Sequence, residues 1–390
     1  MGGRLRRRNA AGRGRAAVAF PPWTARRLSA CEAMNRARVG PPPAAGRAAP
    51  PRAARRRALG IAGATLALAG LGTLGQFVAR RAANAPTPYR YRVVAEAEAA
   101  GFRELGLDEH PRLPVRKIEL LPEGATAAAA LAYAAAPPGA APVLLGWDNR
   151  GAEPLLRPDM RAGEIAALAR SVRQHVPAGA TVLAWPDTSR QLDLLAGTKA
   201  VHSAPLLAPL LLPASWRSAR RAIEASEHRF WQGSSGAEAA ARFARYVDAL
   251  VAPYAEGLAA LRALIEPGAA HLIVQLSDAY RAGVMRPERF AIGWRDFTPG
   301  TQLHGTIAGV KAWLAAQGHR SYAIDARDPA VLRVFFLTDA PSQDTLVARL
   351  LPFSTSNPFR LEAPRILHQQ GPYWVYRIAG SAGHARKEEG

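Results

Sequence analysis

The chain has 390 residues, of which 49% are apolar, so it is long and apolar enough to bury the core of one or two ordinary domains. Its net charge of +21 is unevenly distributed. Residues 1–85 hold 17 of the 51 basic residues and one of the 30 acidic residues, which leaves 34 minus 29, or +5, for residues 86–390. Because the basicity lies mostly in the N-terminal segment, the composition gives no indication of a folded nucleic-acid-binding domain, and we expect no nucleic-acid partner.

The N-terminal segment divides into a polar part and an apolar part. Residues 1–57 are rich in Arg, Ala, Gly and Pro and lack apolar periodicity, which predicts a basic disordered segment. Met34 opens a more usual N-terminus, so we expect residues 1–33 to come from a mis-assigned start. Residues 58–79 form an uncharged apolar run of 22, and at about 1.5 Å per residue such a helix spans a bilayer core of about 30 Å.

Basic residues flank this run unequally and predict its orientation. Many arginines precede it, ending with Arg55–Arg57, whereas only Arg80 and Arg81 follow it closely. The excess on the N-terminal side predicts a cytoplasmic N-terminus and a periplasmic C-terminal part, in an inner-membrane protein with a single span. The segment Ala83-Asn84-Ala85 has the form of a cleavage site, but the length of the run favours an uncleaved anchor.

Beyond a linker at residues 80–88, we expect one periplasmic α/β domain at residues 89–380 and a disordered tail at residues 381–390. The predicted strands are Tyr89–Ala97, Val115–Leu121, Pro142–Trp147, Val182–Trp185, Leu272–Leu276, Phe290–Trp294, Ser321–Ile324, Leu332–Leu337, Ile366–His368 and Trp374–Ile378. The predicted helices are Ala127–Ala136, Gly163–Val176, Gln191–Ala196, Trp216–Trp231, Gly236–Ile265, Gly305–Gln317 and Asp344–Leu350. This alternation predicts an α/β sandwich with a mixed, partly parallel sheet.

Two long helices interrupt the alternation. Trp216–Trp231 and Gly236–Ile265 follow each other without an intervening strand, and Pro253 predicts a kink in the second. We therefore expect a long-helix insertion in the α/β domain.

The stretch Thr181–Lys199 combines a strand, a turn and a helix. Val182–Trp185 is apolar, Pro186 cannot donate a ladder hydrogen bond, and the polar side chains from Asp187 onward are typical of a helix start. Two other apolar runs also end in Trp with an Asp close behind, Val143–Asp148 and Phe290–Asp296. This recurrence predicts a sheet whose strands bring polar residues to one edge.

The candidate ligand-binding residues are therefore Trp147, Asp148, Trp185, Asp187 and Arg190. Ordinary structural roles compete with this interpretation, because Asp is a common helix cap and a strand-end Trp is commonly a core residue. No nucleophile elbow or phosphate-binding loop is present, and we identify no catalytic residue.

Cofactors are constrained by the cysteine and histidine content. The one cysteine, Cys31, leaves residues 86–390 without a thiol, which rules out an internal disulfide, a Cys-rich zinc site, a thiolate-bound iron–sulfur cluster and haem attachment through C-x-x-C-H in this part of the chain. The histidines share no H-x-x-x-H spacing. We expect no cofactor and no metal.

The segment Trp185–Gly197, together with Trp147-Asp148, Phe230-Trp231 and Ser354–Phe359, resembles the hydroxylamine oxidation protein HaoB family. The resemblance covers about residues 55–380 and implies a membrane-anchored periplasmic accessory protein that associates with a multihaem hydroxylamine oxidoreductase. It implies docking, maturation or electron transfer to quinone as the role, without covalent haem of its own and without catalysis. Pro186 stands where a second aromatic residue is expected, and the family has no established catalytic residues to transfer.

Two other functions remain open. The strand, Trp, Asp and helix of Val182–Gly197 are similar to the Trp-Trp-Asp region of oligosaccharyltransferase catalytic subunits, which implies a soluble-domain relative of membrane glycosyltransferases that binds a peptide or glycan. Carboxylates at strand ends, Asp148 and Asp187 first, suggest an Asp-based metal-dependent hydrolase.

Overall fold

The computed structural model describes residues 86–151, 153–233, 236–265, 268–300 and 302–379. The predicted basic segment at residues 1–57, the predicted span at residues 58–79 and the predicted tail at residues 381–390 lie outside the described residues. Within the described ranges, no helix combines the length and the apolar character that crossing a membrane requires.

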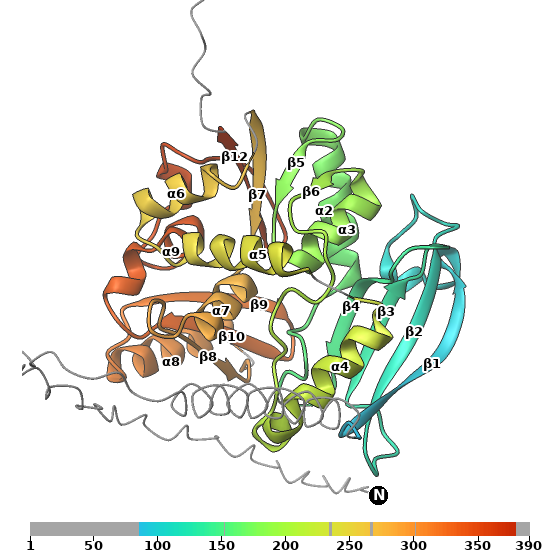
Figure 1. Ribbon diagram of the computed structural model, residues 1–390. Coiled ribbons are helices and arrows are strands. Elements are labelled where there is room, and N and C mark those ends of the chain that lie inside the picture. The colour runs from blue at the N-terminus through green and yellow to red at the C-terminus, as the bar shows by residue number, and fades with distance from the viewer. Residues whose placement is uncertain (1–85, 152, 234–235, 266–267, 301, 380–390) are drawn as a thin grey trace, which may run out of the picture. The chain divides into compact units, whose positions relative to one another are not determined.

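The first sheet is an antiparallel meander formed by consecutive strands (Figure 1). Its strands, in spatial order, are β1 (Tyr89–Glu98), β2 (Pro114–Pro122), β3 (Ala130–Ala135) and β4 (Val143–Asn149). One face supplies buried residues such as Ile118 and Leu120 to a core shared with the helices, and the other carries ion pairs such as Arg92–Glu119. An antiparallel sheet tolerates one solvated face because its strands alternate between apolar and polar residues.

The second sheet has five strands and is partly parallel. Its order is β11 (Arg365–Gln370), β12 (Tyr373–Ala379), β7 (Ala269–Val274), β5 (Thr181–Leu183) and β6 (Lys199–Ala200). β5 runs parallel to β6 and β7, whereas β12 runs antiparallel to both of its neighbours. The mixed α/β architecture with a partly parallel sheet is therefore confirmed.

Helices cover both faces of this sheet. Successive strand residues point to opposite sides, so each strand supplies side chains to two cores. Val182 and Ile273 belong to the core that includes α2 (Ala162–His175) and α3 (Pro186–Ala196). Leu183 and Leu272 belong to the core on the other side. That side contains α5 (Ala237–Leu250), α6 (Tyr254–Arg262), α7 (Leu276–Met285) and α9 (Leu346–Leu350).

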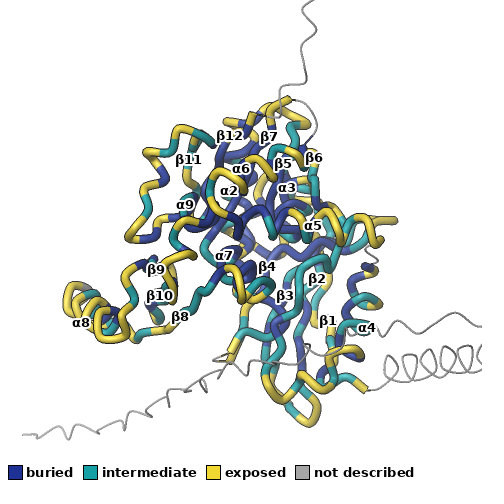
Figure 2. The backbone as a smooth tube through the Cα atoms, turned by 60° about the vertical axis from the view of Figure 1, so that its left-hand side comes forward, coloured by how far each residue is buried: buried dark blue, intermediate teal, exposed yellow. Residues whose placement is uncertain are grey.

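The third sheet is small and antiparallel, with β10 (Val331–Leu337) between β8 (Ile292–Phe297) and β9 (Ser321–Asp328). Helix α8 (Leu303–Ala316) packs on it through Val310 and Leu314. Figure 2 shows that most of α8 is exposed, in contrast to the buried elements around β5 and β7. The described residues also form α4 (Arg220–Phe230) and the 3-10 helices η1 (Ala99–Gly101), η2 (Arg103–Leu105), η3 (Ala214–Ala219), η4 (Pro341–Asp344) and η5 (Pro358–Arg360).

The prediction that the three Trp-ending runs share a sheet is wrong. Trp147 ends up in the four-stranded sheet, Trp185 follows β5 of the five-stranded sheet, and Trp294 lies in the three-stranded sheet. Similar local sequence specifies a strand and its end, but it does not specify which strands pair. The polar residues that follow these strands are therefore not gathered at one sheet edge.

The predicted helix Ala127–Ala136 is also wrong, because Ala130–Ala135 forms β3 between β2 and β4. Alanine has a high helix propensity, but here its small side chain fits the interior of the sheet, where Ala130, Ala132 and Ala134 are buried. Tertiary pairing overrides the local preference.

The long predicted helices are broken. Gly236–Ile265 becomes α5 and α6, with Pro253 in an extended conformation as the residue before α6. The Leu346 amide donates to the Ala252 carbonyl (2.9 Å), so the interruption is stabilised by chain from near the C-terminus. Trp216–Trp231 becomes η3 followed by α4. The insertion itself is present between β6 and β7.

The crossing of α6 over α5 and α9 depends on Gly257. A Cβ atom on Gly257 would lie 2.3 Å from the Ala249 carbonyl oxygen and 2.9 Å from Leu346 Cβ. We expect Gly257→Ala to reduce the free energy of unfolding by about 1–3 kcal/mol, because the backbones would have to separate. Gly163→Ala in α2 is the matched control, since a Cβ there meets nothing within 4 Å and the unfolded chain loses entropy. Urea unfolding tests this, and equal effects of the two substitutions would contradict the packing described.

Candidate functional site

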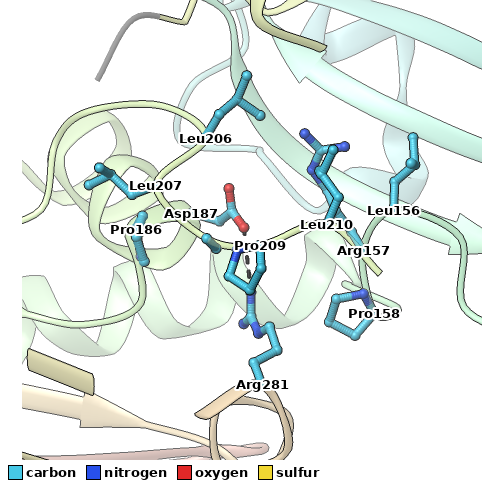
Figure 3. Close-up of a pocket in the computed structure, with 11 residues that line it drawn as sticks. Leu156, Arg157, Pro158, Pro186, Asp187, Leu206, Leu207, Pro209, Leu210 and Arg281 are labelled. Carbon is cyan, nitrogen blue, oxygen red and sulfur yellow. Dashed lines mark ion pairs between the residues drawn. The ribbon is translucent and has the colours of Figure 1, made fainter. Parts of the chain in front are cut away.

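A small cavity of about 20 Å³ lies at the start of α3. Four separate parts of the chain line it, as Figure 3 shows: the stretch after β4, the first turn of α3, the loop after β6, and α7. The lining residues are Leu156, Arg157, Pro158, Pro186, Asp187, Leu206, Leu207, Ala208, Pro209, Leu210 and Arg281. Charged side chains thus meet beneath a loop composed almost entirely of Leu, Pro and Ala.

Arg281 is the buried cation on the α7 side of the cavity. Its side chain is 3% exposed, and it pairs with Asp278 at 2.6 Å and with Asp187 at 3.5 Å. Its guanidinium lies over the ring of Trp185, 4.4 Å from the centroid. Figure 3 shows Arg281 and Asp187 reaching toward each other beside Pro209. Arg281 therefore connects α7 to the first turn of α3 across the cavity wall.

Local sequence positions this arginine. Gln275 and Asp278 form a reciprocal capping box at the start of α7, in which Asp278 accepts from the Gln275 amide at 3.1 Å. Asp278 consequently has two tasks, to cap the helix and to pair with Arg281 one turn later.

Arg157 is the second buried cation, and it belongs to a polar cluster around Glu227. The Glu227 side chain is 1% exposed, and Arg157 Nη1 donates to its Oε2 at 2.9 Å. Trp231 Nε1 donates to the same oxygen at 3.1 Å, and the hydroxyls of Tyr89 and Tyr91 donate to Oε1 at 2.5 and 2.8 Å. We refer to these five residues as the Glu227 cluster.

The charges in the Glu227 cluster stabilise each other. Burial alone would lower the pKa of Arg157, but the Glu227 carboxylate outweighs it and raises that pKa. Burial, then the negative charge of Glu227, raises the pKa of the Tyr91 hydroxyl well above its usual value, so Tyr91 stays a neutral donor. Arg157 also lies over the rings of Trp147 and Trp231, 5.1 and 5.3 Å from their centroids. A buried carboxylate with four donors is fully solvated by protein.

Two leucines beside the cavity have left-handed backbone conformations, Leu156 with φ 62° and Leu206 with φ 59°. Leu156 is fixed by paired backbone hydrogen bonds with Leu211, at 2.7 and 3.0 Å. A non-glycine residue in this region costs roughly 1–3 kcal/mol and persists only where its surroundings hold it. The loop after β6 is therefore held over the cavity by specific contacts.

The five residues predicted from the sequence are only partly brought together. Asp187 lines the cavity, and Trp185 lies directly beneath Arg281. Trp147 does not line the cavity, and Arg157 lies between its ring and the cavity. Asp148 is exposed and pairs with Arg150 at 2.8 Å. Arg190 donates to the carbonyls of Ala141 and Pro142 at 3.2 and 2.8 Å, so it ties α3 to the start of β4.

Neither tryptophan presents a ring to a ligand, because Trp185 is 0% and Trp147 is 2% exposed. A stacking platform for a sugar or peptide requires an accessible aromatic face, which these two residues lack. Asp148 and Asp187 are each paired with a different arginine. Among the residues that the structure describes, no three His, Cys, Asp or Glu side chains are grouped so that they could hold a metal ion.

The dimensions of the cavity limit what it can bind. A space of about 20 Å³ accommodates about one water molecule. Even a ligand of two or three heavy atoms gains at most about 1.5 kcal/mol per atom, which corresponds to millimolar affinity for the smallest. The Arg281 Nε and the Trp185 Nε1 are buried without a protein partner, so a trapped water would satisfy polar groups here. In this geometry the cavity is part of a polar junction between α3, α7 and the loop after β6.

Arg157, Glu227 and Arg281 were missed at the sequence level. Glu227 and Arg157 are 70 residues apart, and Glu227 and Tyr89 are 138 apart, so no short motif joins them. One local signal existed, because Glu227 and Trp231 lie four residues apart on one face of a helix.

The described part of the chain is a mixed α/β structure of three sheets, with buried ion pairs between elements that are distant in sequence. Residues 55–378 match the family model described as HaoA-associated protein HaoB, and the chain belongs to this family. The resemblance expected from the sequence is thus confirmed. The family name points to association with HaoA in hydroxylamine oxidation. The comparisons with curated proteins and with solved structures returned no match.

Two buried groups near the junction have opposite effects on stability below neutral pH. Burial raises the pKa of Asp278 from 3.8 to about 6 against the opposing charge of Arg281. The folded state therefore favours the neutral carboxyl, and this contribution to the free energy of unfolding is lost as pH rises from about 4 to 6. Burial, then Arg242, lowers the pKa of His202 from 6.5 to about 4, so its contribution is lost as pH falls. We expect the two effects to cancel largely between about pH 4 and pH 6 in the wild type.

Single substitutions should separate these effects. The free energy of unfolding of the wild type minus that of Asp278→Asn should decrease by on the order of 3 kcal/mol from about pH 4 to pH 6. The corresponding difference between the wild type and His202→Gln should increase by a similar amount as pH rises from about 4 to about 6.5. Urea unfolding at several pH values measures both. Differences that do not vary with pH would contradict the assigned shifts.

Proposed function

We propose that the chain is a membrane-anchored periplasmic docking protein that holds HaoA at the inner membrane. The observation that carries the proposal is the match over residues 55–378 to the HaoA-associated family. The apolar run at residues 58–79 supports an anchor, and the excess of arginines before it supports a periplasmic location for the α/β domain.

Docking is the simplest of the three accessory roles implied by the family resemblance. Electron transfer to quinone requires a bound redox group, and residues 86–390 contain no cysteine that could attach haem covalently. Maturation of a haem enzyme requires handling of haem or of unfolded chain. Docking requires only a stable folded surface and a tether.

The structure reduces the support for the two competing functions. A glycan- or peptide-binding relative of glycosyltransferases would use the Trp185 region, but Trp185 is 0% exposed beneath Arg281. A hydrolase that uses Asp148 and Asp187 would need both carboxylates on one metal, but each is engaged by its own arginine.

The docking proposal is tested by moving the anchor out of the membrane. Leu66→Arg/Leu71→Arg places two arginines in the apolar run, at a cost of about 2.5–3.5 kcal/mol each near the bilayer centre. We expect the tagged variant and HaoA to shift together from membranes sedimented in neutral, low-salt buffer to the soluble fraction. In the wild type, HaoA should co-purify with the tagged chain from detergent-solubilised native membranes.

Leu66→Ala/Leu71→Ala is the control, because it leaves the run uncharged, and it should keep both proteins in the membrane fraction. Membrane association of HaoA that is unchanged in the arginine variant, or HaoA missing from the wild-type purification, would contradict the docking role.

A further inference from the structure

One exposed surface lies beside the first described strand and combines apolar and basic side chains. We refer to Leu212–Arg221 as the 212–221 segment, which includes η3 and the first residues of α4. Tyr89, the first residue of β1, stacks on Trp216 with ring centroids 5.2 Å apart and an interplanar angle of 19°. The segment is therefore fixed next to the point where the chain enters the α/β domain, and both views place α4 beside β1 (Figures 1 and 2).

The chemistry of this segment is that of a surface that contacts lipid. Arg217, Arg220 and Arg221 are exposed, while Leu212 and Trp216 are half-buried between them and the core. The nearby carboxylate, Glu224, is 3.5 Å from Arg220 and neutralises at most one of the three charges. Arginines together with a tryptophan on one face are typical of segments that lie at a membrane–water interface.

The length of the tether brings this surface close to the bilayer. The predicted span ends at Ala79, and Pro86 is the first described residue, so seven peptide units connect them. Even fully extended, they reach about 25 Å. Thr87 and Pro88 then lead directly to Tyr89, which is held by both Trp216 and Glu227. A tether of this length favours orientations in which the side that bears Tyr89 faces the membrane.

We propose that the 212–221 segment lies in the headgroup layer of the bilayer and that its three arginines bind the phosphates of anionic phospholipids. This inference rests on the proposed anchor and adds an orientation to it. Guanidinium groups bind phosphate oxygens in a bidentate manner, and Trp216 supplies an amphipathic ring at the same level.

The occupant is lipid, not an acidic protein surface, because the tether keeps the segment near the bilayer whether or not a partner is bound. Attraction between basic residues and an anionic lipid surface decays within a Debye length of about 8–10 Å, so only charges held near the surface contribute. Exposed basic residues on other parts of the domain, such as Lys311 on α8, are not tied to the entry point in this way.

The test uses the full-length chain in lipid nanodiscs that carry brominated acyl chains, which quench nearby tryptophan. The difference between the wild type and Trp216→Phe isolates the signal of Trp216 among the eight tryptophans, and phenylalanine preserves stacking on Tyr89. We expect Trp216 to be quenched in discs that contain phosphatidylglycerol. Its quenching should fall at least about twofold in discs of phosphatidylcholine alone and in high salt.

Charge reversal tests the arginines directly. Arg217→Glu/Arg220→Glu/Arg221→Glu should reduce Trp216 quenching to the level of the phosphatidylcholine discs. The matched control, Lys311→Glu/Arg320→Glu/Arg360→Glu, makes the same change in net charge at exposed positions elsewhere and should leave the quenching unchanged. Circular dichroism verifies that each variant is folded.

Trp216 quenching that is absent, or equal in both lipids and in both triple variants, would overturn the proposal. A triple variant that loses HaoA in co-purification while its lipid quenching stays at the wild-type level would overturn it as well, in favour of a protein partner for these arginines. Failure of the anchor itself would appear separately, as wild-type chain released from membranes by carbonate.

Discussion

A single buried carboxylate connects the parts of this protein that matter most for its proposed role. Glu227 accepts from Arg157, Trp231, Tyr89 and Tyr91, so each of its oxygens has two donors. An isolated charge at this depth would be strongly unfavourable, and its stability depends on this complete set of partners. Removal of one partner of such a buried pair typically costs about 3–5 kcal/mol. The cluster therefore specifies one arrangement of the elements that meet there.

The Glu227 cluster also fixes the position of β1 relative to the helix insertion. Tyr89 and Tyr91 belong to β1, Glu227 to α4, and Arg157 to the stretch that lines the cavity. Among the described strands, β1 pairs with β2 alone and lies at the edge of its sheet, so its ladder hydrogen bonds by themselves would leave its start weakly held. The tyrosine hydroxyls attach it to the helix insertion. With the proposed anchor, a strand fixed in this way would relate the position of the membrane to the whole domain, whereas a loosely held strand would not.

The sequence indicated much of this architecture and failed in specific, explicable places. Apolar runs and turn residues identified most strands. The C-terminal end of α3 was predicted correctly at Ala196, before Gly197 with its φ of 64°, whereas the helix begins at Pro186 and not at the predicted Gln191. β3 was missed because an alanine-rich strand lacks the β-branched residues by which strands are identified. A kink was predicted at Pro253, but the structure divides the helix there completely into α5 and α6. The division is stabilised by a bridge between Pro253 and Thr345, which is distant in sequence.

In the candidate site, too, features set by neighbouring residues were predicted, whereas contacts between residues far apart in the sequence were not. Asp187 was found because it follows a strand and starts a helix, and the structure places it in the cavity wall. Asp148 also follows a Trp at the end of an apolar run, yet it lies within β4, is exposed and pairs with Arg150. Local sequence does not distinguish the two, because the difference lies in Arg281, which approaches Asp187 from another part of the chain. Buried ion pairs between distant residues are determined by the fold.

The most direct test of this account is hydrogen–deuterium exchange of the full-length chain, wild type against Glu227→Gln. The substitution keeps the side-chain shape, removes the charge and replaces one of the two acceptor oxygens with an NH2 group, so two of the four donors lose their acceptor. We predict that the amides of β1 exchange about tenfold faster or more in the variant, while those of α8, on the separate three-stranded sheet, are unchanged. Exchange in β1 at the wild-type rate would show that Glu227 does not hold this strand, and the account would fail.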